Sequence, residues 1–211
     1  MAGTLSAVCT FYAITSPRIN LGDAATLGAT APVFVALLAP ALLGERSGRA
    51  VPLAVAVAFA GVVLVLQPTF ESALDVALVA TLGAVLYAIA MLSLRRLGPG
   101  ESHEAVVLHF SLVAFVTMAA LAIPTWHTPS VRDTGWLLAT GLFGGLAQLA
   151  MTRAYALDRA ARISAGTFLG IVFTHLLAIP VFGEHPGWAQ AAGTALVVVA
   201  GLVLARGAAG K

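Results

Sequence analysis

One histidine lies where an ionisable side chain could do chemistry inside an apolar segment. His175 is near the middle of the run 163–183, and Ser164, Thr167 and Ile171 precede it at about helical spacing, so the four share a helix face. A histidine can take up and release a proton near neutral pH. An ionisable group this deep in an apolar slab usually faces a cavity or a partner. His175 could therefore contact a substrate or accept a proton, or it could be a neutral side chain hydrogen-bonded to a neighbouring helix.

A second set of polar residues follows one face of the apolar run 135–157. The spacing is i, i+4, i+7 and i+11, which is one side of a helix, and the residues are Gln148, Thr152, Tyr155 and Arg159. A polar face of this kind should look into a bundle rather than at lipid. It could line a cavity, or it could hydrogen-bond to other helices at about 0.6 kcal/mol per contact.

Arg153 lies in the same run, about one turn before its end. Its aliphatic stem would let the guanidinium reach the lipid headgroups. The alternative is a contact with an anionic group of a substrate.

Two pairs of glycines at four-residue spacing indicate close helix packing. They are Gly141 with Gly145, and Gly166 with Gly170. Small residues at this spacing let two helix backbones approach each other in a membrane. We therefore expect Gly166 and Gly170 to face another helix.

The chain holds none of the short motifs that carry enzymatic chemistry. It has no His-Glu-x-x-His zinc motif, no Gly-x-Ser-x-Gly elbow and no phosphate-binding loop. Cys9 is the only cysteine, so neither a disulfide nor a cysteine metal site can form within one chain. We expect no enzyme activity, no cofactor and no metal site.

The composition predicts that these residues lie in a membrane. Hydrophobic residues make up 60% of the 211 and charged residues only 9%, whereas a soluble domain carries about 25% charged residues. Lipid acyl chains match such an apolar surface. Lys211 is the only lysine and the arginines are scattered, so the chain lacks the basic face of a nucleic-acid-binding protein.

Apolar runs long enough to cross a bilayer recur along the whole chain. A helix needs about 20 apolar residues to cross a hydrocarbon core of about 30 Å. The expected helices number about eight, at about residues 2–16, 23–43, 50–67, 74–94, 104–123, 135–157, 163–183 and 187–206. Pro32, Pro40 and Pro180 fall inside apolar runs and should kink their helices. The expected fold class is all-α, a polytopic transmembrane helix bundle.

The basic residues predict the orientation of these helices, because cytoplasmic loops are enriched in Lys and Arg. If the N-terminus is cytoplasmic, the inside segments hold eight basic residues: Arg46, Arg49, Arg95, Arg96, Arg159, Arg162, Arg206 and Lys211. The outside loops hold only Arg18 and Arg132. We expect a multi-pass protein of the cell membrane (the inner membrane of a bacterium) with both termini cytoplasmic.

The first three and the last three helices carry the same sequence features in the same order. One helix of each set contains a Tyr-Ala pair, at 12–13 and 155–156. The next contains Pro-Val-Phe-Val-Ala-Leu-Leu-Ala in the first set and Ile-Val-Phe-Thr-His-Leu-Leu-Ala in the second, and both end at Gly-Glu. An Ala-Gly pair follows, at 60–61 and 200–201. Because each repeat would be five helices long, which is an odd number, equivalent helices should run in opposite directions, an arrangement found in transporters.

This ordered set of motifs resembles the drug/metabolite transporter superfamily, in its EamA branch, over essentially the whole chain. Members of that family usually have ten helices in two five-helix repeats. The resemblance implies that residues 1–70 form a first repeat with only three helices and that residues 71–211 form a complete second repeat. The first two family helices would then be absent before Met1, as in a fragment, a shortened product or an eight-helix variant.

The resemblance also implies a function, namely secondary transport of a small metabolite or drug-like solute by alternating access. Equivalents of the helix at 135–157 line the pathway in that family, which favours cavity lining for its polar face and, by the repeat, for Tyr12. The residues expected to line a substrate cavity are His175, Tyr155, Gln148, Thr152, Tyr12, Thr167 and Arg153.

The expected partners are a small-molecule substrate and the lipid bilayer. A coupling proton and a homodimer are left open, and no nucleic acid is expected. The alternative function is that of a truncated, non-transporting membrane subunit or paralogue that packs with another transporter chain.

Overall fold

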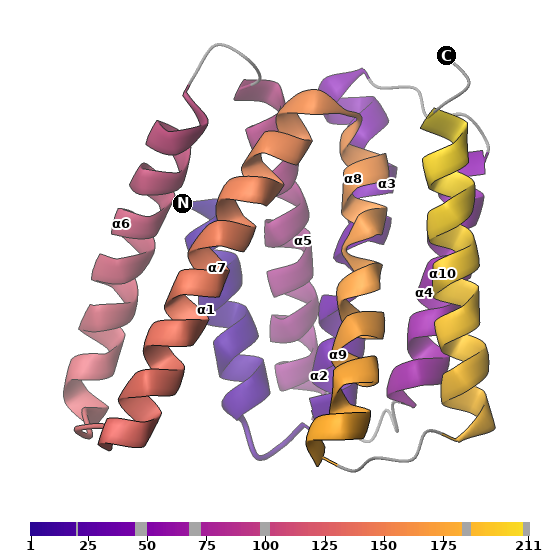
Figure 1. Cartoon of the computed structure of the whole chain (residues 1–211). Coiled ribbons are helices and arrows are strands. Elements are labelled where there is room, and N and C mark those ends of the chain that lie inside the picture. Colours follow the sequence, from indigo (N-terminus) through magenta and orange to yellow (C-terminus); the bar gives the residue numbers. More distant parts are fainter. Residues whose placement is uncertain (20, 45–49, 68–72, 98–101, 183–186, 209–211) are drawn as a thin grey trace.

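The computed structural model describes residues 1–19, 21–44, 50–67, 73–97, 102–182 and 187–208, and it is a bundle of helices (Figure 1). No strand occurs among these residues. The elements are α1 (Ala2–Thr15), α2 (Leu21–Gly28), α3 (Ala31–Leu43), α4 (Ala50–Leu66), α5 (Leu74–Leu97), α6 (His103–Ala122), the 3₁₀ turn η2 (Ile123–Thr125), α7 (Val131–Leu157), α8 (Ala160–Gly166), α9 (Phe168–Phe182) and α10 (Trp188–Ala208). The expected polytopic all-α bundle is confirmed.

Two of the expected helices are interrupted, and each break comes shortly before one of the two similar motifs, Pro-Val-Phe-Val-Ala-Leu-Leu-Ala and Ile-Val-Phe-Thr-His-Leu-Leu-Ala. Residues 23–43 form α2 and α3, which are separated at Ala29 and Thr30, while residues 163–182 belong to α8 and α9, which are separated at Thr167. In each break a threonine hydroxyl donates to the carbonyl oxygen three residues earlier, Thr30 to Leu27 and Thr167 to Ser164. Pro32 occupies the first turn of α3, where its missing N–H costs little. It follows the interruption, whereas we expected it to kink a continuous helix.

Four helical stretches are long and apolar enough to cross a membrane, among the residues that the structure describes. They are Asp23–Leu43, Leu74–Leu97, His103–Ala122 and Val131–Leu157. Shorter apolar helices lie at Ala2–Thr15, Ala50–Leu66, Ala160–Phe173 and Trp188–Val203. Together they occupy the eight places that the sequence predicts.

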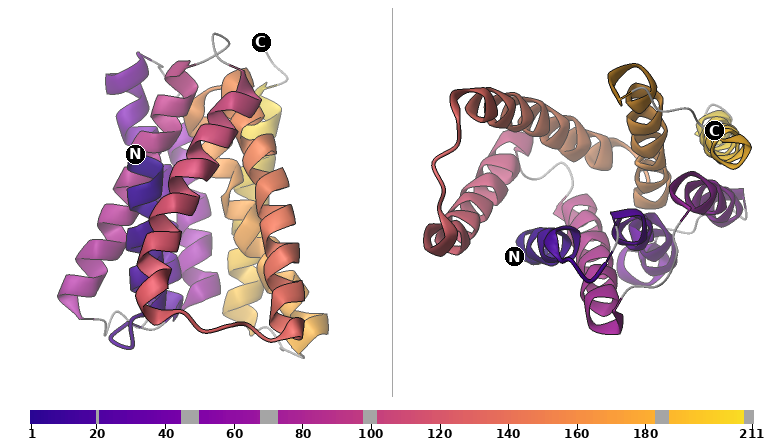
Figure 2. Two further views of the ribbon diagram at one scale, coloured as in Figure 1. Left: turned by 90° about the vertical axis from the view of Figure 1, so that its left-hand side faces the viewer. Right: turned by 90° about the horizontal axis from the view of Figure 1, so that it is seen from below.

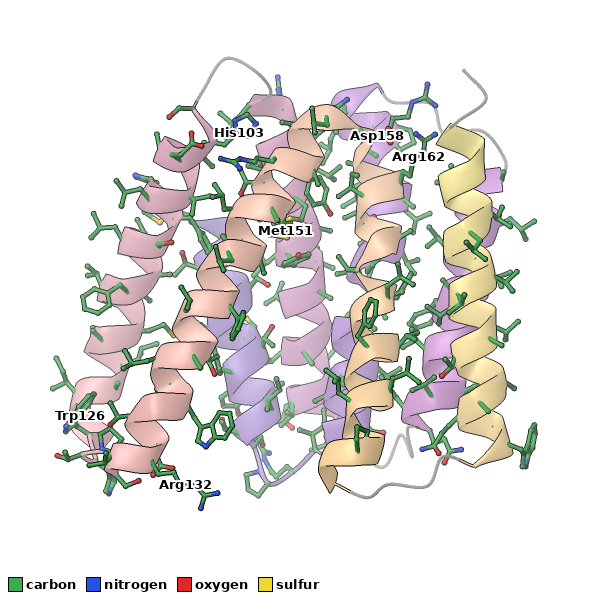
Figure 3. All side chains as sticks on the ribbon, in the orientation of Figure 1. His103, Trp126, Arg132, Met151, Asp158 and Arg162 are labelled. Atoms are coloured by element: carbon green, nitrogen blue, oxygen red, sulfur yellow. The ribbon has the colours of Figure 1, made fainter. Side chains whose placement is uncertain are left out.

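Basic residues are distributed unequally between the two ends of the bundle. Arg95 and Arg96 are in the last turn of α5, and Arg162 lies near the start of α8 at the same end, which we call the Arg-rich end. Arg132 lies at the opposite end, in the first turn of α7 (Figure 3). Arg46, Arg49 and Lys211, together with Glu45 and Glu184, lie outside the described residues.

Helices α4 and α10 cross at close range, because a glycine lies on each of them at the contact. A methyl group at Gly61 would lie 2.7 Å from the backbone oxygen of Gly193, and one at Gly193 would lie 2.5 Å from the oxygen of Gly61. Neither distance leaves room for a carbon atom. Val62, Val197 and Ala200 pack around this crossing in one core cluster.

The glycine pairs singled out from their spacing do not pack in this way. A Cβ atom at Gly141, Gly145, Gly166 or Gly170 would meet nothing within 4 Å. The packing expectation is therefore wrong for both pairs, because spacing along one helix does not show which faces another helix covers. The tight contact occurs at Gly61 and Gly193, which belong to different helices.

Helices α6 and α7 lie to one side of the remaining bundle when the molecule is seen end-on (Figure 2). The described part of α6 has no buried residue, and the buried residues of α7 are Thr152 and Tyr155 in its last two turns. An ion pair between Arg153 and Glu104, with 2.9 Å between nitrogen and oxygen, joins α7 to the start of α6. The outer faces of the two helices are apolar, as expected of surfaces that meet lipid.

Candidate functional site

A cavity of about 500 Å³ lies between α1, α5, α6 and α7. Its walls come from the C-terminal halves of α5 and α7 and the N-terminal half of α6, so it lies toward the Arg-rich end. The lining residues are Met1, Ala2, Gly3, Ser6, Ala7, Thr10 and Phe11 from the α1 segment, Tyr87, Ala90, Met91, Ser93, Leu94 and Leu97 from α5, Val106 and Phe110 from α6, and Gln148, Met151 and Thr152 from α7.

The cavity wall combines apolar surface with a few uncharged polar groups. No acidic or basic side chain is among the lining residues described. The hydroxyls of Ser6, Ser93 and Thr152 donate to backbone carbonyls at 2.8–2.9 Å, so each has acceptor lone pairs left for a ligand. Pockets of this composition suit small organic molecules, because apolar walls supply affinity and a few polar groups supply orientation.

Gln148 is the lining residue whose side chain is an amide, and this side chain makes no hydrogen bond to another described residue. Its backbone oxygen accepts from the Thr152 hydroxyl at 2.9 Å, which leaves the side-chain amide with both donors and its acceptor available. Nearby, the Tyr87 hydroxyl donates to the sulfur of Met151 at 3.1 Å and joins α5 to α7 across the cavity.

A groove of about 370 Å³ between α6 and α7 shares Phe110 and Gln148 with the cavity. Glycines at 141, 144 and 145 form its α7 wall, and Phe115 and Met118 belong to its α6 wall. Gln148 therefore lies where the two spaces meet.

Two of the residues predicted from sequence, Gln148 and Thr152, line this cavity together. Tyr155, from the same predicted face, does not. It is fully buried beside the cavity and packs in a core cluster with Ala88 and Met91. The polar face of α7 is longer than the part of the helix that lines the cavity. Its later residue Tyr155 therefore packs in the core instead.

The other predicted residues lie apart from the cavity. Tyr12 is 47% exposed and its hydroxyl accepts from Arg18 at 3.4 Å. Thr167 is exposed at the break between α8 and α9, and Arg153 pairs with Glu104. The backbone of His175 belongs to α9, but its side chain lies outside the described part of the structure.

Several residues that line the cavity were not predicted from the sequence. Ser6 and Thr10 on α1 are four residues apart, which is the spacing that identified the polar face of α7, and they could have been found in the same way. Tyr87, Met91 and Phe110 carry no such signal, because apolar and aromatic residues at helical spacing describe packing as readily as a binding surface.

Charged groups gather where α7 ends and α8 begins. The Arg162 guanidinium lies 2.7 Å from the Asp158 carboxylate, and the backbone N–H of Arg159 donates to that carboxylate at 2.6 Å. Burial alone would raise the pKa of Asp158, but the hydrogen bonds from Arg162 and from the backbone outweigh burial and hold the pKa below its ordinary value. Asp158 is therefore ionised at neutral pH, and this contact persists until the solution becomes strongly acidic.

The apolar helix bundle is that of a polytopic membrane protein, and a cavity beside interrupted helices is an arrangement found in transporters. A solved crystal structure shares its fold, with a TM-score of 0.77 and 21% identity over 95% of this chain and 73% of that one. The chain belongs to the EamA-like transporter family, whose model matches residues 75–206.

Named relatives in this family are transporters. The chain is 34% identical over 206 residues to the pseudopaline exporter CntI of Pseudomonas aeruginosa, covering 97% of this chain and 72% of that protein. It is 29% identical over 189 residues to a riboflavin transporter of Rhizobium johnstonii, covering 89% and 63%. It is 25% identical over 213 residues to solute carrier family 35 member G1 of Mus musculus, covering 93% and 57%. The family and these relatives point to a transporter and not to an enzyme.

Proposed function

We propose that the chain is a secondary transporter that carries a small solute across the cell membrane by alternating access. The solute would bind in the cavity between α1, α5, α6 and α7. The observation that carries this proposal is the cavity itself, about 500 Å³ of mostly apolar wall with hydroxyl groups and one amide. Burying an unpaired charge among such groups is costly, so the substrate class that fits is an uncharged or weakly polar organic molecule with hydrogen-bonding groups.

The paired interruptions support alternating access. Breaks in repeat-equivalent helices give each half of a transporter a point where it can bend, and in an inverted repeat the halves can exchange roles. The α2–α3 break and the α8–α9 break would be such a pair if the two sets of motifs are copies of one repeat. In this proposal residues 1–70 and 71–211 are the two repeats, and the similar motifs beside the two breaks support that division.

Uptake by purified protein in proteoliposomes tests the proposed function. A panel of labelled solutes should include riboflavin, because a relative is named as a riboflavin transporter, together with neutral amino acids, nucleosides and charged metabolites. We expect saturable uptake of at least one uncharged member above protein-free liposomes. A parallel series with an imposed pH gradient tests a coupling proton, which is proposed from the presence of His175. Uptake confined to anionic or cationic members would contradict the proposed substrate class.

The proposed orientation places the Arg-rich end in the cytoplasm. Reporter fusions at Lys211 and in the segment 95–103 should then read as cytoplasmic, whereas a fusion near Thr128 should read as external. A periplasmic alkaline phosphatase and a cytoplasmic fluorescent protein give opposite signals at each site. A cytoplasmic signal at Thr128 would reverse the orientation.

A non-transporting subunit is the second candidate, and the exposed apolar faces of α6 and α7 favour it. Such a chain would copurify with another transporter and give no uptake when reconstituted alone. Uptake by the reconstituted chain alone would rule this candidate out.

A further inference from the structure

Arg18 ties the connector between α1 and α2 to the beginning of α5, at the end of the bundle opposite the Arg-rich end. Its guanidinium lies 2.7 Å from the carboxylate of Asp75 in the first turn of α5 and 3.4 Å from the hydroxyl of Tyr12. The backbone oxygen of Arg18 also accepts from the N–H of Ala73 at 3.1 Å. A carboxylate at this helix N-terminus interacts favourably with the helix dipole, which places Asp75 at the start of α5 as the partner of Arg18.

Arg95 makes the corresponding contact at the Arg-rich end. It lies in the last turn of α5 and donates to the backbone oxygens of Tyr155 at 3.2 Å and of Ala156 at 2.9 Å. These carbonyls belong to the last turn of α7, where no intrahelical donor remains for them. A guanidinium at this end of a helix also meets the negative end of its dipole. One arginine therefore joins the end of α5 to the end of α7.

Both contacts involve the Tyr-Ala pair that marks the two repeats. Tyr12 belongs to the first copy and contacts Arg18, and Tyr155-Ala156 is the second copy and accepts from Arg95. Each pair also comes just before one of the interrupted helices. The cavity lies between these two contacts and is walled by α1, α5 and α7.

We propose that Arg18 and Arg95 are positioning residues of the transport cycle, and that each closes one end of the pathway by holding a Tyr-Ala junction against α5. Release of the Arg18–Asp75 contact would open the cavity to the external face, and release of the Arg95 contact would open it to the cytoplasmic face. The proposal rests on the alternating-access function proposed above. The Arg18 and Asp75 side chains are 53% and 59% exposed, and exposed ion pairs are weak. A contact that forms and breaks in every cycle should be weak.

Side-selective cysteine labelling tests this proposal. Cys9→Ser removes the single native thiol, and Thr10→Cys places a thiol in the cavity wall. A membrane-impermeant methanethiosulfonate reagent is then applied to right-side-out and to inside-out vesicles. Asp75→Asn breaks the external contact and Arg95→Gln breaks the cytoplasmic one. Asp133→Asn and Arg96→Gln are matched controls, because they change the same charges at the same ends without touching these contacts.

We expect opposite shifts in the two variants. Asp75→Asn should raise the labelling rate from the external face about three- to tenfold, as a shift between two conformations of similar energy would do. Arg95→Gln should raise labelling from the cytoplasmic face by a similar factor, and the controls should match the parent. The exchanged pair Arg18→Asp with Asp75→Arg should bring the rate at the external face back toward the parental value, but only in part, because an arginine at the start of α5 opposes the helix dipole.

Equal rates in the parent and both variants at each face, including no labelling at all, would overturn the proposal. So would a rise at both faces together, which indicates a loosened fold. The uptake panel is a separate readout. Opposite labelling shifts without any uptake would support the role of the two contacts and contradict transport of the tested solutes. Uptake without side-selective labelling shifts would contradict only the role of the two contacts.

Discussion

Gly61→Ala and Gly193→Ala should each destabilise the protein strongly although each adds only one methyl group. The new carbon would lie 2.7 Å or 2.5 Å from a backbone oxygen of the facing helix, so α4 and α10 must separate and lose contacts along their whole length. Overpacking of this kind costs about 1–3 kcal/mol. For a chain of this size, that corresponds to a fall of roughly 3–10 °C in the melting temperature.

Gly141→Ala is the matched control for these variants. It places a methyl group in the middle of α7, where nothing lies within 4 Å. Alanine is favoured over glycine in a helix by about 1 kcal/mol, so the control should melt at the parental temperature or slightly above. The measurement is thermal unfolding of detergent-purified protein, together with the yield of monodisperse material. Equal melting of all four proteins would show that α4 and α10 do not cross at these glycines.

Ser93→Trp should abolish transport while leaving the fold intact. Ser93 lines the cavity and its hydroxyl donates only to the Ile89 carbonyl of its own helix, so an indole there would fill the cavity without displacing a core residue. We expect uptake to fall at least tenfold. Thr140→Trp is the control, because Thr140 is exposed, bonds to the carbonyl of Trp136 in the same way and lines neither space.

Gln148→Leu tests whether a hydrogen bond from the cavity wall contributes to solute binding, without filling the cavity as Ser93→Trp does. It keeps the size of the side chain and removes the amide that faces the cavity. One lost hydrogen bond is worth about 0.5–1.5 kcal/mol, so KM should rise by roughly two- to tenfold with the maximal rate nearly unchanged. Normal uptake by both Ser93→Trp and Gln148→Leu would place the solute elsewhere in the protein.

The helices were predictable because the apolar runs are long and the connectors are short and polar. The breaks at Thr30 and Thr167 were not, because a threonine that bonds to its own helix looks the same in sequence whether the helix continues or stops. The similar motifs were visible in the sequence, but the contacts of their Tyr-Ala pairs with Arg18 and Arg95 depend on where α5 lies. No pattern within α1 or α7 contains that information.

The candidate site was predictable in part. Gln148 and Thr152 were found because polar residues spaced along one face of an apolar helix are conspicuous. The same rule included Tyr155, which lies in the core, since periodicity gives a face but not the point where a cavity ends. Tyr87, Met91 and Phe110 become recognisable only when α1, α5, α6 and α7 are placed around one space.

Counterflow tests alternating access most directly. Proteoliposomes are loaded with a high concentration of the unlabelled solute that the uptake panel identifies, and are then diluted into a trace of the labelled form. A carrier whose single cavity faces one side at a time will exchange the two forms, so labelled solute should accumulate transiently above its equilibrium level. Ser93→Trp should remove this overshoot, and Thr140→Trp should retain it. A monotonic approach to equilibrium in the parent, unaffected by Ser93→Trp, would contradict alternating access through the cavity described above.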